Sequence, residues 1–371
     1  MARPGSRAAG GTRRAAGGGD ANAWRHGPPH TLWHHGQVSR IDIEALEDEW
    51  EEDHGLPPRP SRELSQKAKQ RIEALGSARV VAVDRGRITV VHEGEVRDAT
   101  LAGTMRGTKA AVGDRVRIRP PRHESDVARI VEVLDRETVL TRTPDDTLDE
   151  ERVVVANADQ VVVVLGADNL APGTRFADRV LVAASVGGLD PVVCINKMDL
   201  VEQADAAAAS RAEVEEVVGR YEQVGIEVRR TCALTGAGLH ELEELLVGCW
   251  TAFSGHSGVG KTSLYNRLVP HAEREVGELG RYGGRHTTVS SRAMEIPALD
   301  AWVVDTPGVR SFGLGGVAPA ELGRHFPELA DLGCELSDCL HEGEPGCRLG
   351  EARIHPERLA SYRRLLAAVR E

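Results

Sequence analysis

The sequence predicts a multidomain protein with an N-terminal β-barrel, a central α/β domain and a small, mostly helical C-terminal domain that binds a metal. Three features indicate this architecture. Short β-branched segments fill residues 79–133, apolar strands alternate with helices from about residue 153, and three Cys and one His cluster near the C-terminus. We expect the following domains: a tail at 1–75, the barrel at 76–142, the α/β domain at 150–316 and the metal-binding domain at 319–371.

The predicted tail, residues 1–75, is biased in composition. Residues 1–41 hold six Arg and one acid, whereas residues 42–53 hold eight acids and no base. The low-complexity start of this tail buries too little apolar surface to offset the entropy of ordering it. The chain has no apolar run of the roughly 20 residues that span a bilayer, and its start has no apolar export segment. We therefore expect a cytoplasmic protein without a membrane partner.

The barrel is predicted from a series of short strands. We expect them at 79–83, 87–91, 95–101, 114–119 and 127–133. Five short strands within about 65 residues are typical of a small barrel of the OB or SH3-like type, and we predict an OB-like one. Alternation places Arg115, Arg117 and Arg119 on one face, which either binds nucleic-acid phosphates or is simply solvated. The net charge of −11 does not exclude a nucleic-acid partner, because binding depends on local patches.

The α/β domain is predicted from strands and helices that alternate along the chain. We expect strands at Val161–Leu165, Pro191–Ile195, Ile226–Arg230, 249–253 and 301–304. We expect helices at 174–186, 203–221 and Leu239–Leu246, and another that starts at about residue 260. Apolar strands that alternate with helices predict a parallel sheet covered on both faces.

A phosphate-binding loop is the strongest motif in this domain. The pattern G-x-x-x-x-G-K-[ST] is matched by Gly255, His256, Ser257, Gly258, Val259, Gly260, Lys261 and Thr262, and Ser263 follows. An apolar strand precedes the motif and a helical run follows it. Backbone N–H groups and the helix N-terminus would face phosphate oxygens. Lys261 would neutralise the β- and γ-phosphates, and Thr262 would hold Mg²⁺.

Two further motifs point to guanine. Asn196, Lys197, Met198 and Asp199 match N-K-x-D, in which the Asp accepts hydrogen bonds from the ring N–H and the exocyclic amine of guanine. Adenine offers neither donor, so a buried carboxylate would remain unpaired. The segment 231–236 is similar to the S-A-x loop that backs the base, with Cys232 where Ser is usual, followed by Ala233 and Leu234. We therefore expect the site to bind GTP and GDP.

Two segments match nucleotide-sensing loops. Asp305, Thr306, Pro307 and Gly308 match D-x-x-G, in which Asp305 would hold Mg²⁺ through water and the Gly308 N–H would sense the γ-phosphate. A switch loop at 284–288 would supply a Thr to Mg²⁺, and we favour Thr288 over Thr287.

The order of the motifs along the chain is circularly permuted relative to an ordinary GTPase, because the guanine motifs precede the phosphate-binding loop. A sheet tolerates this order, since ligand contacts come from strand ends.

The C-terminal segment contains Cys334, Cys339, His341 and Cys347. Three thiolates and one imidazole complete a tetrahedral Zn²⁺ site, which predicts one structural zinc and no open position for catalysis. The remaining cysteines, Cys194, Cys232 and Cys249, are expected to be buried as small apolar residues. The closing helix is expected to carry five arginines that form either an RNA-phosphate surface or a solvated face: Arg353, Arg358, Arg363, Arg364 and Arg370.

The order of these motifs over about residues 76–371 resembles the ribosome small-subunit-dependent GTPase A family, RsgA, also called YjeQ. The resemblance implies a GTPase that binds the small (30S) ribosomal subunit and its rRNA late in maturation, with hydrolysis stimulated by that subunit and zinc in the C-terminal domain. We also expect a monomer. Val309 stands where many GTPases place a water-orienting Gln, so we expect His286 of the switch loop to position the attacking water. His286 as a simple loop or RNA-contact residue remains the alternative.

Four other functions fit part of the pattern. A P-loop ATPase or small-molecule kinase would explain the phosphate-binding loop but not the guanine motifs. A non-enzymatic RNA-binding module would use the nucleotide for stability alone. A zinc hydrolase would need an open metal position. A cytosolic GTPase switch without a ribosomal role fits residues 150–316 alone.

Overall fold

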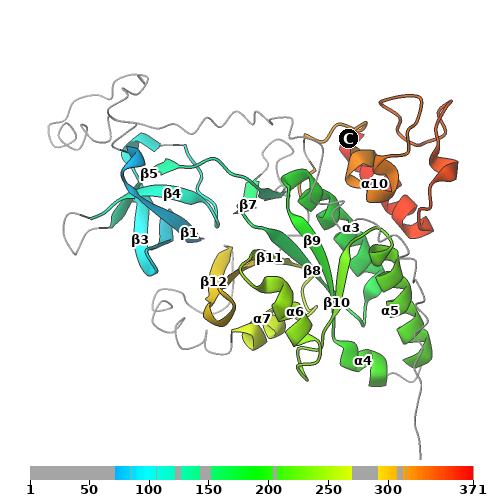
Figure 1. Ribbon diagram of the computed structural model, residues 1–371, viewed down its shortest axis with the longest axis horizontal. Coiled ribbons are helices and arrows are strands. Elements are labelled where there is room, and N and C mark those ends of the chain that lie inside the picture. The colour runs from blue at the N-terminus through cyan, green and yellow to red at the C-terminus, as the bar shows by residue number, and fades with distance from the viewer. Residues whose placement is uncertain are drawn as a thin grey trace, which may run out of the picture.

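A five-stranded barrel forms the first part of the structure, a computed structural model (Figure 1). The structure describes residues 72–84, 86–105, 107–121, 127–142, 152–203, 207–269, 291–306, 312–314 and 316–370. The barrel strands are β1 (Gly76–Asp84), β2 (Arg87–His92), β3 (Glu95–Leu101), β4 (Arg115–Arg119) and β5 (Ala128–Val133). They follow the order β1-β2-β3-β5-β4, and a β1–β4 pairing closes the barrel. The predicted five-stranded barrel is confirmed.

Strand alternation in the barrel follows the sequence pattern. In β4, Val116 and Ile118 are buried, whereas the arginines at 115, 117 and 119 lie half-buried on the other face. Arg115 forms an ion pair with Glu137 at 2.7 Å, and Arg117 donates to the carbonyl of Leu75 at 3.1 Å. The three arginines therefore share one face, as predicted, but part of its hydrogen-bonding capacity is already engaged within the barrel.

The barrel is attached to the α/β sheet through β1. Ala82 pairs with Arg292 of β12 (Arg292–Ile296) in antiparallel register. The Arg79 guanidinium lies 3.4 Å from the ring centroid of Trp250 and donates to the carbonyl of Asn157. Burial lowers the pKa of Arg79 to about 10. Stacking and hydrogen bonding on one half-buried cation therefore link the two domains.

The α/β sheet has the strand order β10-β9-β8-β11-β13-β12. Its strands are β8 (Gln160–Gly166), β9 (Asp190–Asn196), β10 (Glu227–Arg230), β11 (Trp250–Ser254), β12 and β13 (Ala301–Asp305). Pairings among β8, β9, β10, β11 and β13 are parallel, whereas β12 runs antiparallel to β13. The carboxyl ends of the parallel strands therefore meet at one edge.

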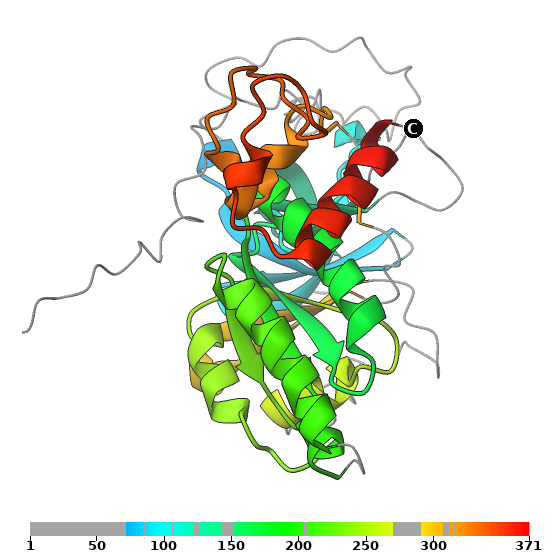
Figure 2. The same ribbon diagram turned by 90° about the vertical axis from the view of Figure 1, so that its right-hand side faces the viewer.

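Helices cover both faces of this sheet (Figure 2). They are α3 (Leu170–Gly187), α4 (Met198–Gln203), α5 (Ala207–Glu222), α6 (Leu239–Leu246) and α7 (Lys261–Leu268). Val161 and Val163 of β8 pack in one core with α3 and α5, whereas Val162 packs in the other core with α6 and α7. A strand buried on both faces needs the continuous Val run seen here. The helix expected at 203–221 corresponds to α5, and α4 precedes it without a counterpart among the predicted helices.

A small two-stranded sheet joins the barrel to the α/β domain. It pairs β6 (Val139–Arg142) with β7 (Arg152–Ala156) in antiparallel register. A Cβ added to Gly187 at the end of α3 would lie 1.8 Å from the carbonyl oxygen of Val139. The small sheet therefore approaches α3 at a position that only glycine allows.

The C-terminal segment packs against α3. It contains η5 (Leu322–His325), α9 (Pro327–Ala330), η6 (Leu349–Glu351) and α10 (Pro356–Arg370). Phe326 and Tyr362 belong to the same buried core as α3, with their rings edge to face at 5.3 Å. Among the helices of the described ranges, none is both long and apolar enough to cross a bilayer.

Two expectations for the closing helix are wrong. Arg353 precedes α10 rather than lying on it. Arg358 is expected on an RNA-phosphate or solvated surface, but its side chain is 1% exposed and forms ion pairs with Asp178 of α3 and Glu328 of α9, each at 2.7 Å. The helix pattern alone does not reveal buried carboxylates on other elements, so the sequence could not distinguish this arginine from its neighbours.

Candidate functional site

Three loops meet at the carboxyl edge of the parallel sheet. They follow β11 (residues 255–260), β9 (residues 197–199) and β10 (residues 231–236). Parallel strands bring their carboxyl ends together, and ligands of open α/β sheets bind at this edge. The loops are up to 63 residues apart in sequence, yet a single side chain, Asn196, joins all three.

Asn196 is the last residue of β9 and is 1% exposed. Its Nδ2 donates to the carbonyl of Val259 in the phosphate-binding loop at 3.0 Å. Its Oδ1 accepts the backbone N–H of Ala233 at 3.0 Å and the hydroxyl of Thr231 at 3.2 Å. A buried amide with its donor and acceptor both engaged fixes the relative positions of the loops.

In the phosphate-binding loop, Gly260 lies directly against the side chain of Asn196. Gly260 has a φ of 97°, in the region that favours glycine. A Cβ on Gly260 would lie 2.2 Å from Asn196 Nδ2, so a side chain there would displace the bridging amide. Close approach between two loops, as well as backbone conformation, therefore explains the glycine before Lys261.

Lys261 begins α7 and folds back over the loop. Its Nζ donates to the carbonyls of Gly255 at 2.6 Å and His256 at 3.0 Å. Burial lowers its pKa, and the charge of Asp305 opposes that shift. The ammonium is therefore held within the loop, close to the backbone N–H groups that would face an anion. Thr262 and Ser263 follow it on α7 and are exposed.

A pocket of about 570 Å³ lies between the three loops. Its lining includes Asn196, Lys197, Asp199, Leu200, Ala233, Leu234, Gly258, Gly260, Ser263, Asn266 and Arg267. Leu234 and Leu200 are 72% and 41% exposed. The pocket thus offers a carboxylate, apolar rims and the phosphate-binding loop, which together suit a purine nucleotide better than a small anion.

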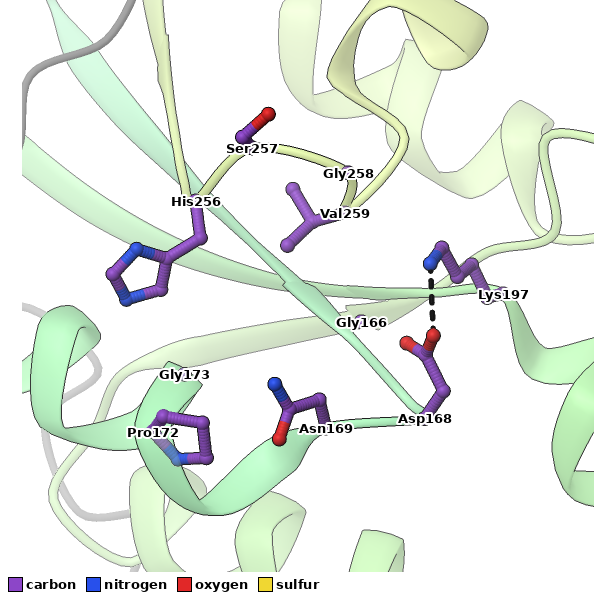
Figure 3. Close-up of a pocket in the computed structure, with 10 residues that line it drawn as sticks. All are labelled: Gly166, Asp168, Asn169, Pro172, Gly173, Lys197, His256, Ser257, Gly258 and Val259. Atoms are coloured by element: carbon purple, nitrogen blue, oxygen red, sulfur yellow. Dashed lines mark hydrogen bonds and ion pairs between the residues drawn. The ribbon is translucent and has the colours of Figure 1, made fainter.

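A second pocket of about 390 Å³ adjoins the first and shares Lys197 and Gly258 with it. Figure 3 shows the phosphate-binding loop on one side of this pocket and the start of α3 on the other. Lys197 Nζ forms an ion pair with Asp168 Oδ2 at 2.9 Å at one end of it. The ring of His256 packs on Phe176 of α3, with centroids 4.5 Å apart.

Asp199 and Cys232 face each other across the guanine-motif loops. Cys232 Sγ donates to Asp199 Oδ1 at 3.0 Å. The predicted burial is confirmed for Cys194 and Cys232, whereas Cys249 is half-buried.

The backbone also joins the two guanine motifs. Met198 begins α4, and its backbone N–H donates to the carbonyl of Thr231 at 3.2 Å. The two guanine motifs therefore contact each other through both side chains and backbone.

Asp305 ends β13 beside Lys261. Its Oδ1 is buried and has no hydrogen-bond partner among the described residues, and burial raises its pKa. An unpartnered buried carboxylate oxygen fits a role as a direct or water-mediated ligand of a hard cation such as Mg²⁺. Three expected site residues, His286, Thr288 and Gly308, lie outside the described residues.

The cysteine and histidine cluster is assembled in the C-terminal segment. His341 Nδ1 lies 3.6 Å from the sulfurs of Cys334 and Cys339 and 3.8 Å from that of Cys347. All four ligand atoms lie within 4.8 Å of one another. Tetrahedral Zn²⁺ with ordinary Zn–S and Zn–N bonds separates such atoms by about 3.6 Å. The cluster therefore fits a closed zinc site. Burial lowers the pKa of His341, which favours the neutral, metal-binding imidazole.

Several residues that line the two pockets are not among those predicted from the sequence, including Asp168, Leu200 and Arg267. Asp168 pairs with Lys197, Leu200 forms an apolar rim, and Arg267 donates to the carbonyls of Ala233 and Leu234 at 3.0 and 2.5 Å. Asp168 directly follows the buried strand β8, whose carboxyl end lies at the site, so its position in the sequence could have identified it as a site residue. Nothing in the local pattern singles out the other two.

Comparison with known proteins gives one consistent family. Residues 133–315 match the family model described as RsgA GTPase. The chain is 37% identical over 308 residues to small ribosomal subunit biogenesis GTPase RsgA of Azotobacter vinelandii, covering 78% of this chain and 87% of that protein. It is 36% identical over 313 residues to the protein of the same name from Chlorobaculum tepidum, covering 79% and 98%.

Two solved structures share the fold. The crystal structure of YjeQ from Thermotoga maritima aligns with a TM-score of 0.63 and 30% identity, over 79% of this chain and 98% of that chain. The structure of YloQ, whose title describes a circularly permuted GTPase, aligns with a TM-score of 0.60 and 24% identity, over 81% and 96%. The permuted motif order inferred from the sequence therefore has a structural counterpart.

Proposed function

The chain belongs to the RsgA GTPase family, and we propose that it hydrolyses GTP to GDP and phosphate during late maturation of the small ribosomal subunit. The observation that carries the proposal is the convergence of three loops on one pocket, joined by Asn196. The relatives' names favour a ribosomal role over a cytosolic GTPase switch.

The pocket would bind the base and the phosphates of the nucleotide through different groups. Asp199 would accept two hydrogen bonds from guanine, with Leu234 and the Lys197 stem beside the base. Lys261 would leave the carbonyls of the loop and bind the β- and γ-phosphates, which are stronger acceptors because they are charged. Backbone N–H groups of residues 256–262 would complete the phosphate site.

Magnesium would be held by Thr262, Asp305 and Thr288, together with the nucleotide. The unpartnered Oδ1 of Asp305 supports this assignment. When bound, the ion would neutralise charge that develops on the phosphates. Asp305 must be ionised to act as a ligand, and the adjacent Lys261 charge stabilises that form.

The attacking water needs a positioning group, and we assign this role to His286. Residue 309 is Val, whose side chain cannot hydrogen-bond water, so unassisted turnover should be slow. Stimulation by the small subunit would then arise from rRNA contacts that hold His286 beside the γ-phosphate. The Gly308 N–H would contact the same phosphate.

The flanking domains would bind rRNA of the small subunit, and the C-terminal domain would hold one structural zinc. The half-buried arginine face of β4 and the arginines of α10 other than Arg358 supply positive charge for phosphates. We also propose the cytoplasmic location and the monomeric state that are expected from the sequence.

The test is GTP hydrolysis with and without purified small ribosomal subunits. We expect slow phosphate release from the protein alone, acceleration of about tenfold or more with small subunits, and no acceleration with large subunits. Lys261→Ala, measured alongside, should abolish both rates. Equal rates with and without small subunits would reject the ribosomal role, and hydrolysis of ATP as fast as GTP would reject the guanine assignment.

A further inference from the structure

Glu344 lies within the loop of the cysteine and histidine cluster but is not one of its four expected zinc ligands. It stands between His341 and Cys347 in the sequence and is half-buried. Its Oε1 accepts the backbone N–H of Leu340 at 2.8 Å, and its Oε2 accepts that of Glu342, also at 2.8 Å. One carboxylate therefore binds the backbone N–H groups of the residues on either side of His341.

The backbone of His341 has a conformation that needs such support. Its φ is 56°, in the left-handed region that residues other than glycine adopt only rarely. A side chain-bearing residue keeps this conformation only where the surrounding contacts fix it. The hydrogen bonds from Glu344 fix the chain immediately before and after His341. They thereby set the direction from which its imidazole enters the cluster.

A second expected ligand, Cys339, is held by the same group. Its Sγ donates to Glu344 Oε2, with 3.6 Å between sulfur and oxygen. Leu340, the residue between the two ligands, is bound from both sides, because its N–H donates to Glu344 and its carbonyl accepts the hydroxyl of Tyr362 of α10 at 2.8 Å. The segment that carries Cys339 and His341 therefore has a defined conformation.

Resting on the zinc site of the proposed function, we propose that Glu344 is a positioning residue that holds Cys339 and His341 in a zinc-binding arrangement before the ion binds. Three thiolates and one imidazole already fill a tetrahedral site, so the carboxylate would act through the ligands and not as one of them. A loop that is ordered in advance loses less conformational entropy on binding. Groups that orient metal ligands in this way commonly change metal affinity by about 10- to 100-fold.

The experiment measures the affinity of the full chain for zinc by competition with a chromophoric chelator. Cys347→Ser, measured alongside, gives the zinc that binds elsewhere in the chain. In Glu344→Ala we expect Kd for zinc to rise by about 10- to 100-fold. Glu344→Gln keeps one acceptor oxygen for the two N–H groups, so its Kd should rise less. Asp338→Asn is the matched control, because it removes the same charge from an exposed residue beside Cys339 and should leave Kd nearly unchanged.

Cobalt(II) bound in place of zinc reports the ligands directly, because its visible absorption depends on their identity and geometry. At saturating cobalt, Glu344→Ala should give the same bands as the unmodified protein, since the four ligands are retained. A changed spectrum would identify Glu344 as a ligand and overturn the positioning role. A rise in zinc Kd as large in Asp338→Asn as in Glu344→Ala would also overturn it, because charge alone would then explain the effect.

The same titrations separate this proposal from the zinc site on which it rests. If the unmodified protein binds no more zinc than Cys347→Ser, the zinc site itself is rejected. If the unmodified protein binds zinc at the cluster and Glu344→Ala binds it equally tightly, the positioning role alone is rejected. Gln has nearly the volume of Glu, so Glu344→Gln carries the test if the Ala variant does not fold.

Discussion

The Arg358 guanidinium lies 2.7 Å from the Asp178 carboxylate, and both side chains are almost completely buried. The same arginine reaches Glu328 with two nitrogens, and Asp178 also accepts the hydroxyl of Tyr221 at 3.2 Å. This network fastens the C-terminal segment to α3, whose first turn lines the pocket beside the phosphate-binding loop. The docking of the two domains thus rests on a charged cluster rather than on apolar contacts alone.

Removal of that arginine should destabilise the protein strongly. In Arg358→Ala, two carboxylates remain buried without a cation, which costs about 3–5 kcal/mol. Denaturant unfolding followed by fluorescence measures the change. Arg363→Ala on the same helix is the matched control, because Arg363 is exposed, and it should change stability by about 0.5 kcal/mol or less. Equal effects of the two substitutions would contradict the network.

The bridge made by Asn196 should support nucleotide affinity. Asn196→Ala leaves the Val259 carbonyl and the Ala233 N–H without partners and lets the loops separate, at a cost of about 1–3 kcal/mol. We expect Kd for GDP to rise by about 10- to 100-fold in a fluorescence titration. Gln223→Ala, an exposed amide just after α5, should bind like the unmodified protein. Unchanged affinity in Asn196→Ala would show that the loops do not act together.

Asp199→Asn should change the preferred base. The amide presents one donor and one acceptor, which complement xanthine rather than guanine, so GTP should bind more weakly and xanthosine triphosphate more strongly. Competition of both nucleotides for the variant and the unmodified protein measures the exchange. A variant that keeps the original order of affinities would place the guanine contact at another residue.

Metal removal should unfold the region around the cysteine cluster. We expect one zinc per chain by elemental analysis and loss of this zinc in Cys347→Ser. Limited proteolysis should then cut within residues 332–355, because this segment has few regular elements to hold it without the metal. Cys249→Ser is the control and should retain the full zinc content. A protein that retains one zinc in the Cys347→Ser variant would require a different ligand set.

Much of the fold follows from local sequence pattern. Helix α6 has the predicted limits, Leu239–Leu246, and the five barrel strands lie within a few residues of the predicted segments. Helix α3 begins at Leu170 rather than at 174, although Pro172 and Gly173 are typical of loops. Pro fits the first turn of a helix, where its missing N–H has no intrahelical partner. Gly173 lies against Leu165, where a Cβ would be 3.2 Å from a methyl carbon.

The elements and site contacts that the sequence did not predict depend on packing between segments far apart in the chain. Strands β6, β7 and β12 are four or five residues long and have no counterpart among the predicted elements, since their pairing with distant segments has no local signature. The motifs identified Asn196, Asp199 and Cys232, but not that Asn196 turns inward to join loops or that the other two share a hydrogen bond. Such contacts depend on the packing of elements far apart in the chain.

The central claim is that loops in permuted order form one guanine nucleotide site, and a crystal structure with Mg²⁺ and GDP tests it most directly. We predict Asp199 within hydrogen-bond distance of both guanine donors and Lys261 within hydrogen-bond distance of the β-phosphate of the same molecule. A nucleotide bound away from either residue, or a base that faces another element, would contradict the account.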